Sequence, residues 1–70
     1  MTNKIKVLIA DEPAMQTRFE QLFEAMPETT IIGLASTAEE TIKKAKALQP
    51  NIILIDTNLP DMDGFAATEI

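Results

Sequence analysis

Apolar residues recur along the chain in two alternating patterns, one typical of strands and one typical of helices. Residues 4–10 begin with alternation and end in a continuous apolar run, as a strand does when it enters a covered sheet. Residues 29–34 are rich in β-branched Thr and Ile and predict a second strand. Residues 52–55 are all apolar, which is the pattern of a strand buried on both faces of a parallel sheet. Three strands are therefore expected.

A helix is predicted between the first two strands, over about 13–26. Pro13 has the fixed φ angle that suits a helix start, and Pro27 ends the segment because proline cannot continue a helix. The apolar side chains between them recur every three or four residues and are Met15, Phe19, Leu22, Phe23 and Met26. This spacing predicts that one face of the helix packs against the core.

A second helix is predicted between the second and third strands. A capping box can begin it, formed either by Thr37 with Glu40 or by Ser36 with Glu39. Pro50 closes it, because proline cannot continue a helix. Its buried side is expected to consist of Ala38, Thr41, Ile42, Ala45 and Leu48.

The order of the predicted elements is βαβαβ, followed by the opening of a third helix at residues 65–70. This last segment is too short to form a stable helix on its own, so it is interpreted as an interrupted element. Strands that alternate with helices imply a parallel sheet with right-handed crossovers. The chain contains no internal repeat, low-complexity run or linker, so residues 1–70 are interpreted as a single α/β unit.

The composition excludes several classes of protein. The 70 residues include no Cys, so the chain can form no disulfide and no zinc site of the sulfur-rich kind. No stretch approaches the roughly 20 apolar residues that span a bilayer, and a cytoplasmic protein without membrane contact is expected. The net charge of -5 argues against direct contact with nucleic-acid phosphates. The basic residues Lys43, Lys44 and Lys46 instead suit a solvated helix face near a C-terminus.

The loop after the third strand carries a specific motif. Asp56 ends the strand, and Leu59-Pro60 and Met62-Asp63-Gly64 follow at fixed spacing. An Asp in this position often does no more than end a strand. The whole stretch, however, closely resembles the phosphoacceptor signature of response regulator receiver domains, Asp-x-x-Met-Pro-x-Met-Asp-Gly, and departs from it only at Leu59.

The resemblance implies a flavodoxin-like, doubly wound fold with strand order 2-1-3-4-5. Residues 1–70 then form a partial receiver domain, its N-terminal half, in which strands 2-1-3 are present. A receiver also uses a Ser or Thr after its fourth strand and a Lys after its fifth, and both positions lie beyond residue 70. Without these contacts, phosphorylation of the 70-residue chain is expected to be slow or absent.

Carboxylates follow two strands that are neighbours in this order. Asp11 and Glu12 end the first strand and Asp56 ends the third, so the three should converge on one rim of the sheet. Negative charges that converge either raise a carboxyl pKa or recruit a hard cation such as Mg²⁺. The resemblance implies that Mg²⁺ is bound by Asp11, Glu12, Asp56 and the backbone carbonyl of Asn58. It also implies that Asp56 accepts a phosphoryl group from a sensor histidine kinase.

The acidic pair departs from the usual pattern of the family. Receivers usually have two acidic residues, then a variable residue and often Pro, whereas Pro13 follows Asp11 and Glu12 directly. Either both acids form the metal-binding pair and the loop is one residue shorter, or Glu12 fills the variable position and only Asp11 remains. The first alignment is favoured here, and the second would weaken metal binding.

Three functions are compatible with these features. The leading one is a phosphoacceptor module, not an enzyme, and the start and end of the chain are most similar to receivers that control transcription. The alternative is a truncated or engineered half-domain that acts only as a structural module and forms a homodimer through the open edge of its third strand. A phosphatase of the haloacid dehalogenase type is disfavoured, because Asn58 and Pro60 stand where that class has Asp and Thr.

Overall fold

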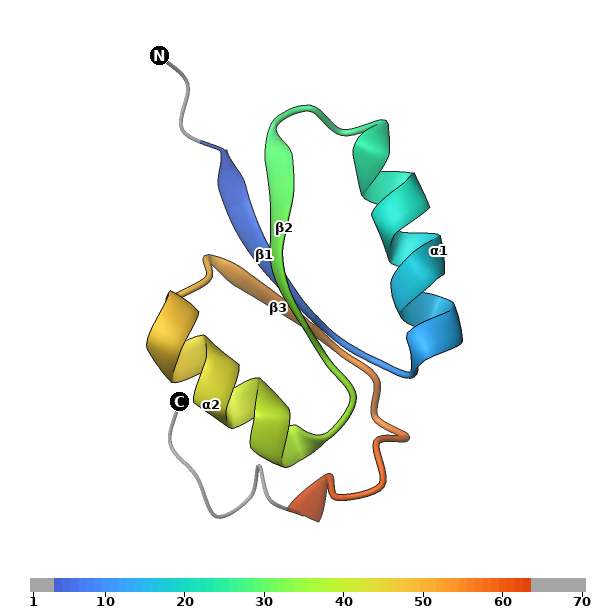
Figure 1. The fold of residues 1–70 in the computed structure, drawn as a ribbon, viewed down its shortest axis with the longest axis vertical. Helices are drawn as coiled ribbons and strands as arrows, with labels where there is room; N and C mark the ends of the chain where they lie inside the picture. The colour runs from blue at the N-terminus through green and yellow to red at the C-terminus, as the bar shows by residue number, and fades with distance from the viewer. Residues whose placement is uncertain (1–3, 64–70) are drawn as a thin grey trace.

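A computed structural model describes residues 4–63 of the chain. The predicted βαβαβ order and the strand order 2-1-3 are confirmed, because the three strands form one parallel sheet with β1 in the middle (Figure 1). The predicted third helix at 65–70 lies outside the described residues. The elements are β1 (Ile5–Ala10), α1 (Pro13–Glu24), β2 (Thr29–Ala35), α2 (Ala38–Leu48) and β3 (Ile52–Ile55).

The two helices cover opposite faces of the sheet, with α1 on one side of the strands and α2 on the other (Figure 1). The reason lies in the strand order, because the chain crosses from β1 to β2 in one direction and from β2 past β1 to β3 in the other. Crossovers of the same hand that run in opposite directions place their helices on opposite faces. The direction reverses at β1, so the carboxyl ends of β1 and β3 flank the point where such folds bind ligands.

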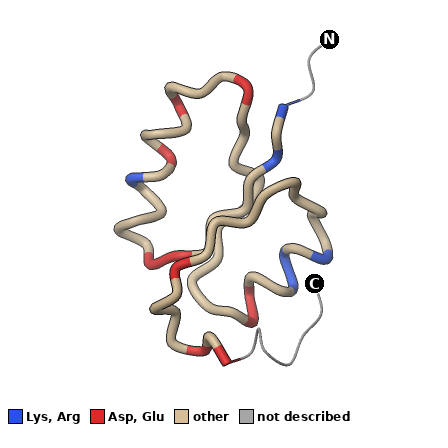
Figure 2. Tube along the Cα trace, turned by 180° about the vertical axis from the view of Figure 1, so that it is seen from behind, with Lys and Arg blue, Asp and Glu red and all other residues tan. Residues whose placement is uncertain are grey.

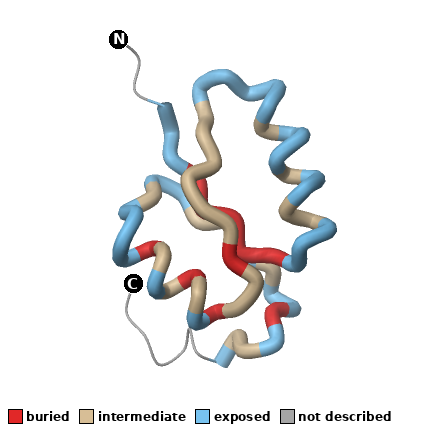
Figure 3. Tube along the Cα trace, in the orientation of Figure 1, coloured by how far each residue is buried: buried red, intermediate tan, exposed pale blue. Residues whose placement is uncertain are grey.

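The core is built around β1. Val7, Leu8, Ile9 and Ala10 are each at most 1% exposed, and they form the most continuous buried segment in Figure 3. The prediction that residues 52–55 are buried on both faces is wrong for the described part of the chain. Ile52 is 45% exposed and Ile55 is 39% exposed, because in the described residues both helices pack mainly over β1 and β2, and β3 has a neighbouring strand on one edge only.

The prediction for the first helix is also corrected. The helix ends at Glu24, and none of its residues is buried. Leu22 is 52% exposed, and Met26, beyond the end of the helix, is 45% exposed. The helix contacts the sheet with a narrow apolar stripe, in which the rings of Phe19 and Phe23 stack with their centroids 6.4 Å apart. The stripe is narrower than predicted, because only its central positions reach the strands.

The second helix packs more closely. Its N-cap is Thr37, whose side chain accepts a hydrogen bond from the backbone N–H of Glu40, so the first of the two predicted capping pairs is confirmed. Ala38, Thr41 and Ala45 are buried as predicted, whereas Leu48 is 39% exposed. Close approach to the sheet depends on a glycine in β2, because a Cβ at Gly33 would lie 2.9 Å from Cδ1 of Leu48. Within residues 4–63, no helix is long and apolar enough to cross a membrane.

Candidate functional site

The backbone hydrogen bonds of the sheet continue past the ends of the strands and hold the backbone of Asp11 and Asp56 in place. The N–H of Asp11 donates to the carbonyl of Ala35 at the end of β2, over 2.9 Å. The N–H of Asp56 donates to the carbonyl of Ala10 at the end of β1, over 2.8 Å. Both carboxylates therefore project from the carboxyl-terminal rim of the sheet, as the sequence predicted, on strands that are hydrogen-bonded to each other.

A cleft of about 380 Å³ opens at this rim, and all four residues predicted to bind the metal line it. Two of its walls come from the ends of β1 and β3, and a third comes from the residue that follows β2. Its lining consists of Asp11, Glu12, Met15, Ser36, Asp56, Asn58, Leu59 and Pro60. Ser36 was predicted only as a possible helix cap, and it lies in the cleft because it directly follows β2, which pairs in parallel with β1.

The two acids that follow β1 differ in their surroundings. Asp11 is only 8% exposed, and its Oδ1 accepts a hydrogen bond from the backbone N–H of Glu12 over 2.7 Å. Glu12 is exposed and occupies the N-cap position of α1, where its side chain makes no capping hydrogen bond. Pro13 begins the helix directly afterwards, so the turn between β1 and α1 is short. Asp11 is thus held rigidly, whereas the carboxylate of Glu12 is free to turn into the cleft.

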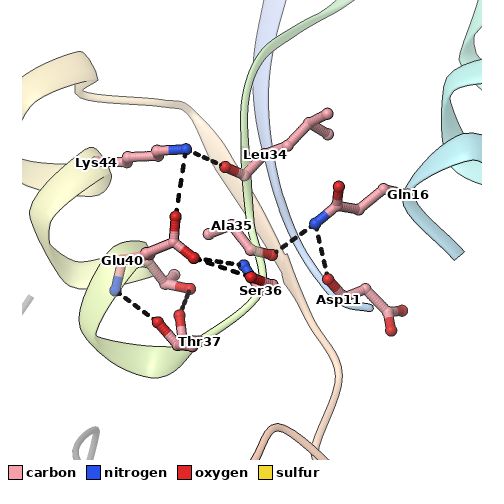
Figure 4. Close-up of polar contacts among 9 residues, drawn as sticks. Asp11, Gln16, Leu34, Ala35, Ser36, Thr37, Glu40 and Lys44 are labelled. Carbon is pink, nitrogen blue, oxygen red and sulfur yellow. Dashed lines mark hydrogen bonds and ion pairs between the residues drawn. The ribbon is translucent and has the colours of Figure 1, made fainter. Parts of the chain in front are cut away.

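Gln16 stabilises the position of Asp11 from α1. Its Nε2 donates to the backbone carbonyl of Asp11 over 2.8 Å and to that of Ala35 over 3.0 Å (Figure 4). One side-chain amide therefore joins the ends of β1 and β2 to the first helix. The sequence pattern does not reveal this role, since Gln16 lies between the apolar positions of the helix and its partners are backbone atoms.

The loop after β3 is ordered by its own hydrogen bonds and by a small apolar cluster. The N–H of Asn58 donates to Oδ1 of Asp56 over 3.0 Å, which is an Asx turn. Leu59 is 6% exposed and packs on Ala10 and Ala35, with Met62 against the same cluster. The apolar residues Leu59 and Met62 therefore seat the loop on the ends of β1 and β2, while Asp56 and Asn58 line the cleft.

A polar network forms the side of the site nearest α2. The hydroxyl of Ser36 donates to Oε1 of Glu40 over 2.9 Å, and this hydrogen bond is the main cause that lowers the pKa of Glu40 (Figure 4). The ammonium of Lys44 lies 3.8 Å from Oε2 of Glu40 and donates to the backbone carbonyl of Leu34. Ser36 is held in the cleft wall by these contacts, so the wall is continuous with the first turns of α2.

The donor chemistry of the cleft fits Mg²⁺. Carboxylate and carbonyl oxygens are the ligands that this ion prefers, and it usually keeps several waters. Within residues 4–63, no three acidic side chains lie close enough together to form a ready-made metal cluster. A cleft of about 380 Å³ lined by oxygen donors suits a partly hydrated ion bound by a few of them. Figure 2 shows acidic residues where β1 and β3 end and along the following loop, so the local charge also favours a cation.

The fold and the site together define a doubly wound domain with an acidic cleft at the carboxyl ends of its strands. The sequence model of the response regulator receiver domain matches residues 7–70. The chain therefore belongs to the response regulator receiver domain family.

Two relatives illustrate the similarity. The nitrate/nitrite response regulator protein NarL of Escherichia coli strain K12 is 41% identical over 58 residues, which cover 83% of this chain and 27% of that protein. A protein-glutamate methylesterase/protein-glutamine glutaminase of Carboxydothermus hydrogenoformans is 37% identical over 68 residues, which cover 96% of this chain and 19% of that protein. The chain thus spans only a minor part of the length of these relatives.

Proposed function

We propose that the chain is the phosphoacceptor module of a two-component response regulator, and that Asp56 accepts a phosphoryl group from a sensor histidine kinase. One observation carries the proposal: Asp56, Asp11, Glu12 and Asn58 line a single cleft in a chain of the receiver family. The module acts as an acceptor and switch rather than as an enzyme. The full-length protein controls transcription in this proposal, which rests on the resemblance of the start and end of the chain to receivers of transcription regulators.

In the proposed reaction, a carboxylate oxygen of Asp56 attacks the phosphorus atom. A P–O bond forms while the P–N bond to the kinase histidine breaks, and the electron pair of that bond stays on the imidazole nitrogen. Since Oδ1 of Asp56 accepts a hydrogen bond from Asn58, Oδ2 is the oxygen free to react. Asp11, Glu12, Asp56 and the carbonyl of Asn58 would hold Mg²⁺, which would neutralise negative charge on the phosphoryl oxygens.

Phosphorylation of the 70-residue chain by acetyl phosphate in the presence of Mg²⁺ tests the proposal, with intact mass as the readout. We expect slow addition of one phosphoryl group to the wild type and none to Asp56→Asn. Asp63→Asn is the matched control, because it makes the same change at an exposed acid outside the cleft. A label retained on Asp56→Asn would contradict the proposal, and rapid, complete labelling of the wild type would contradict the expectation that the 70-residue chain is a slow acceptor.

A second function, self-association, is favoured by the exposed edge of β3. In the described part of the chain β3 pairs only with β1, and Ile52 and Ile55 are exposed on it. An unpaired strand edge is a template for pairing with another chain. Two copies related by a two-fold axis would align their β3 strands antiparallel and form a continuous sheet of order 2-1-3-3-1-2. A chain that acted only through such a homodimer, without accepting a phosphoryl group, would be a purely structural module.

A further inference from the structure

A carboxylate outside the predicted site connects the loop after β3 to the start of α2. Asp61 accepts two hydrogen bonds from the first two residues of that helix. Its Oδ1 accepts from the N–H of Ala38 over 2.5 Å, and its Oδ2 accepts from the N–H of Glu39 over 3.1 Å. Both N–H groups lack partners inside the helix, and a negative charge is favourable at this end of the helix dipole. The Ala38 bond is the main cause that lowers the pKa of Asp61.

This contact fixes a loop that is anchored at two other points. The loop begins where the N–H of Asp56 binds the carbonyl of Ala10, and Leu59 is buried on the apolar cluster. Asp61 is the polar anchor at the far end. Asn58, whose carbonyl is the proposed Mg²⁺ ligand, lies between these anchors. The path of the backbone at Asn58 is therefore determined partly by where Asp61 holds the loop.

The helix does not depend on Asp61 for its cap. The hydroxyl of Thr37 already accepts the N–H of Glu40, and the side chain of Glu40 accepts from Ser36 in return. These are the contacts of a capping box shifted by one residue. Loss of Asp61 would leave α2 capped but would release the loop, so the contact serves the loop more than the helix.

We infer that Asp61 is a positioning residue of the phosphoacceptor cleft, an inference that rests on the proposed function. By holding the loop against the N-terminus of α2, its carboxylate keeps the carbonyl of Asn58 at the cleft that Asp11 and Asp56 line. Residues that orient metal ligands without touching the metal commonly determine metal affinity. Asp61 also joins the cleft to a helix, so a change of the loop on phosphorylation would reach α2 directly.

The first experiment tests the contact itself and does not depend on function. Asp61→Asn keeps the shape of the side chain but removes its charge and replaces one acceptor with a donor. We expect amide hydrogen exchange at Ala38 and Glu39 to accelerate in this variant, while exchange at Glu40, held by Thr37, stays unchanged. Asp63→Asn is the charge-matched control and should leave all three amides unchanged. Unchanged exchange at Ala38 and Glu39 in Asp61→Asn would overturn the inference.

The second experiment tests positioning by titrating Mg²⁺ and following the backbone amide signals of the loop. We expect Asp61→Asn to bind Mg²⁺ about tenfold more weakly than the wild type, the lower end of what loss of a supporting residue costs a metal site. Asp63→Asn should bind as the wild type does. Equal affinity for Asp61→Asn and Asp63→Asn would overturn the inference and leave the proposed function intact.

The remaining outcomes are equally decisive. If the wild type binds no Mg²⁺, the proposed function fails and the positioning role fails with it, although the exchange experiment would still report the contact. If Asp61→Asn loses its fold by circular dichroism, Asp61 is a general stabilising residue and the inference is overturned. A reduced Mg²⁺ affinity in a folded Asp61→Asn, with accelerated exchange confined to Ala38 and Glu39, supports it.

Discussion

At the residue scale, the site combines acids that can be predicted from the sequence with polar residues that cannot be predicted from it. Asp11 and Asp56 could be predicted because each directly follows an apolar run, and parallel strands bring their carboxyl ends to one rim. Gln16 and Asp61 could not, because their partners are backbone atoms far along the chain. Such contacts form only after the strands have paired in their final order, so they cannot be predicted from the local spacing of residues in the sequence.

The lowered pKa values of Asp61 and Glu40 predict how stability depends on pH. Each carboxylate accepts hydrogen bonds in the fold, and these hold its pKa below the ordinary value of 3.8 for Asp61 and 4.5 for Glu40. Their contribution is complete above the unfolded pKa and is lost as pH falls through the folded pKa. We expect the urea midpoint of the wild type to drop between roughly pH 5 and pH 3.

Asp61→Asn isolates one part of this effect. The variant should be less stable than the wild type at neutral pH, and its urea midpoint should fall less on acidification, because it lacks one of the two carboxylates, Asp61 and Glu40, whose pKa is lowered by the fold. Asp63→Asn provides the comparison, since it removes an acid without these hydrogen bonds. Parallel acid profiles for the wild type and Asp61→Asn would show that the contact with α2 contributes nothing in solution.

At the element scale, the two helices show that the spacing of apolar residues predicts where a helix forms but not how much of it is buried. The spacing of apolar residues correctly predicted that both segments are helical, but it assigned α1 a wider buried face than it has. The closer packing of α2 has its cause in the opposite strand, where Gly33 has no side chain to hold the helix away. The apolar residues of a helix are those that can be buried, whereas the shape of the sheet against which the helix packs determines how many of them are buried.

Gly33 provides the prediction for this scale. A Cβ there would lie 2.9 Å from Cδ1 of Leu48 and 3.1 Å from Cδ1 of Leu8. The partly exposed Leu48 can turn away from an added methyl group, but the buried Leu8 has to shift, so Gly33→Ala should lower the free energy of unfolding by about 1 kcal/mol. Gly33→Val adds branches against the buried Leu8 and should lower the free energy of unfolding by about 1–3 kcal/mol, as overpacking commonly does. Urea denaturation of the three proteins checks this, and equal stability of the Val variant would show that Leu8 and the other side chains around Gly33 can make room for the added branches.

At the scale of the whole molecule, the burial of β1 and the exposure of β3 form one pattern. β1 has a strand on both edges and a helix near each face, and four of its residues are essentially inaccessible. β3 is as apolar in sequence but has a neighbour on one edge only in the described part of the chain. The apolar sequence of β3 predicts burial on both faces, but residues 4–63 do not cover it to that extent.

The exposed edge of β3 predicts association of the 70-residue chain. Pairing of two β3 strands would satisfy backbone groups on that edge and bury Ile52 and Ile55, which are 45% and 39% exposed. A domain of this size buries only about 60% of the surface of its unfolded chain, so added burial between copies is a substantial stabiliser. We therefore expect either a dimer or a poorly folded monomer in sedimentation experiments at tens of micromolar.

Charge at this edge should abolish the dimer. Ile52→Lys replaces an apolar side chain of each facing strand with a cation, which loses the apolar contact of the dimer and has to be desolvated when the strands pair. Ile52 is already exposed, so the monomer should tolerate the change. Leu22→Lys is the matched control, because it replaces an exposed apolar residue on α1, far from the β3 edge in sequence and on another element. We expect Ile52→Lys to sediment as a monomer and Leu22→Lys as a dimer. A wild-type chain that is a compact, cooperatively melting monomer at the same concentration would show that the exposed edge needs no partner.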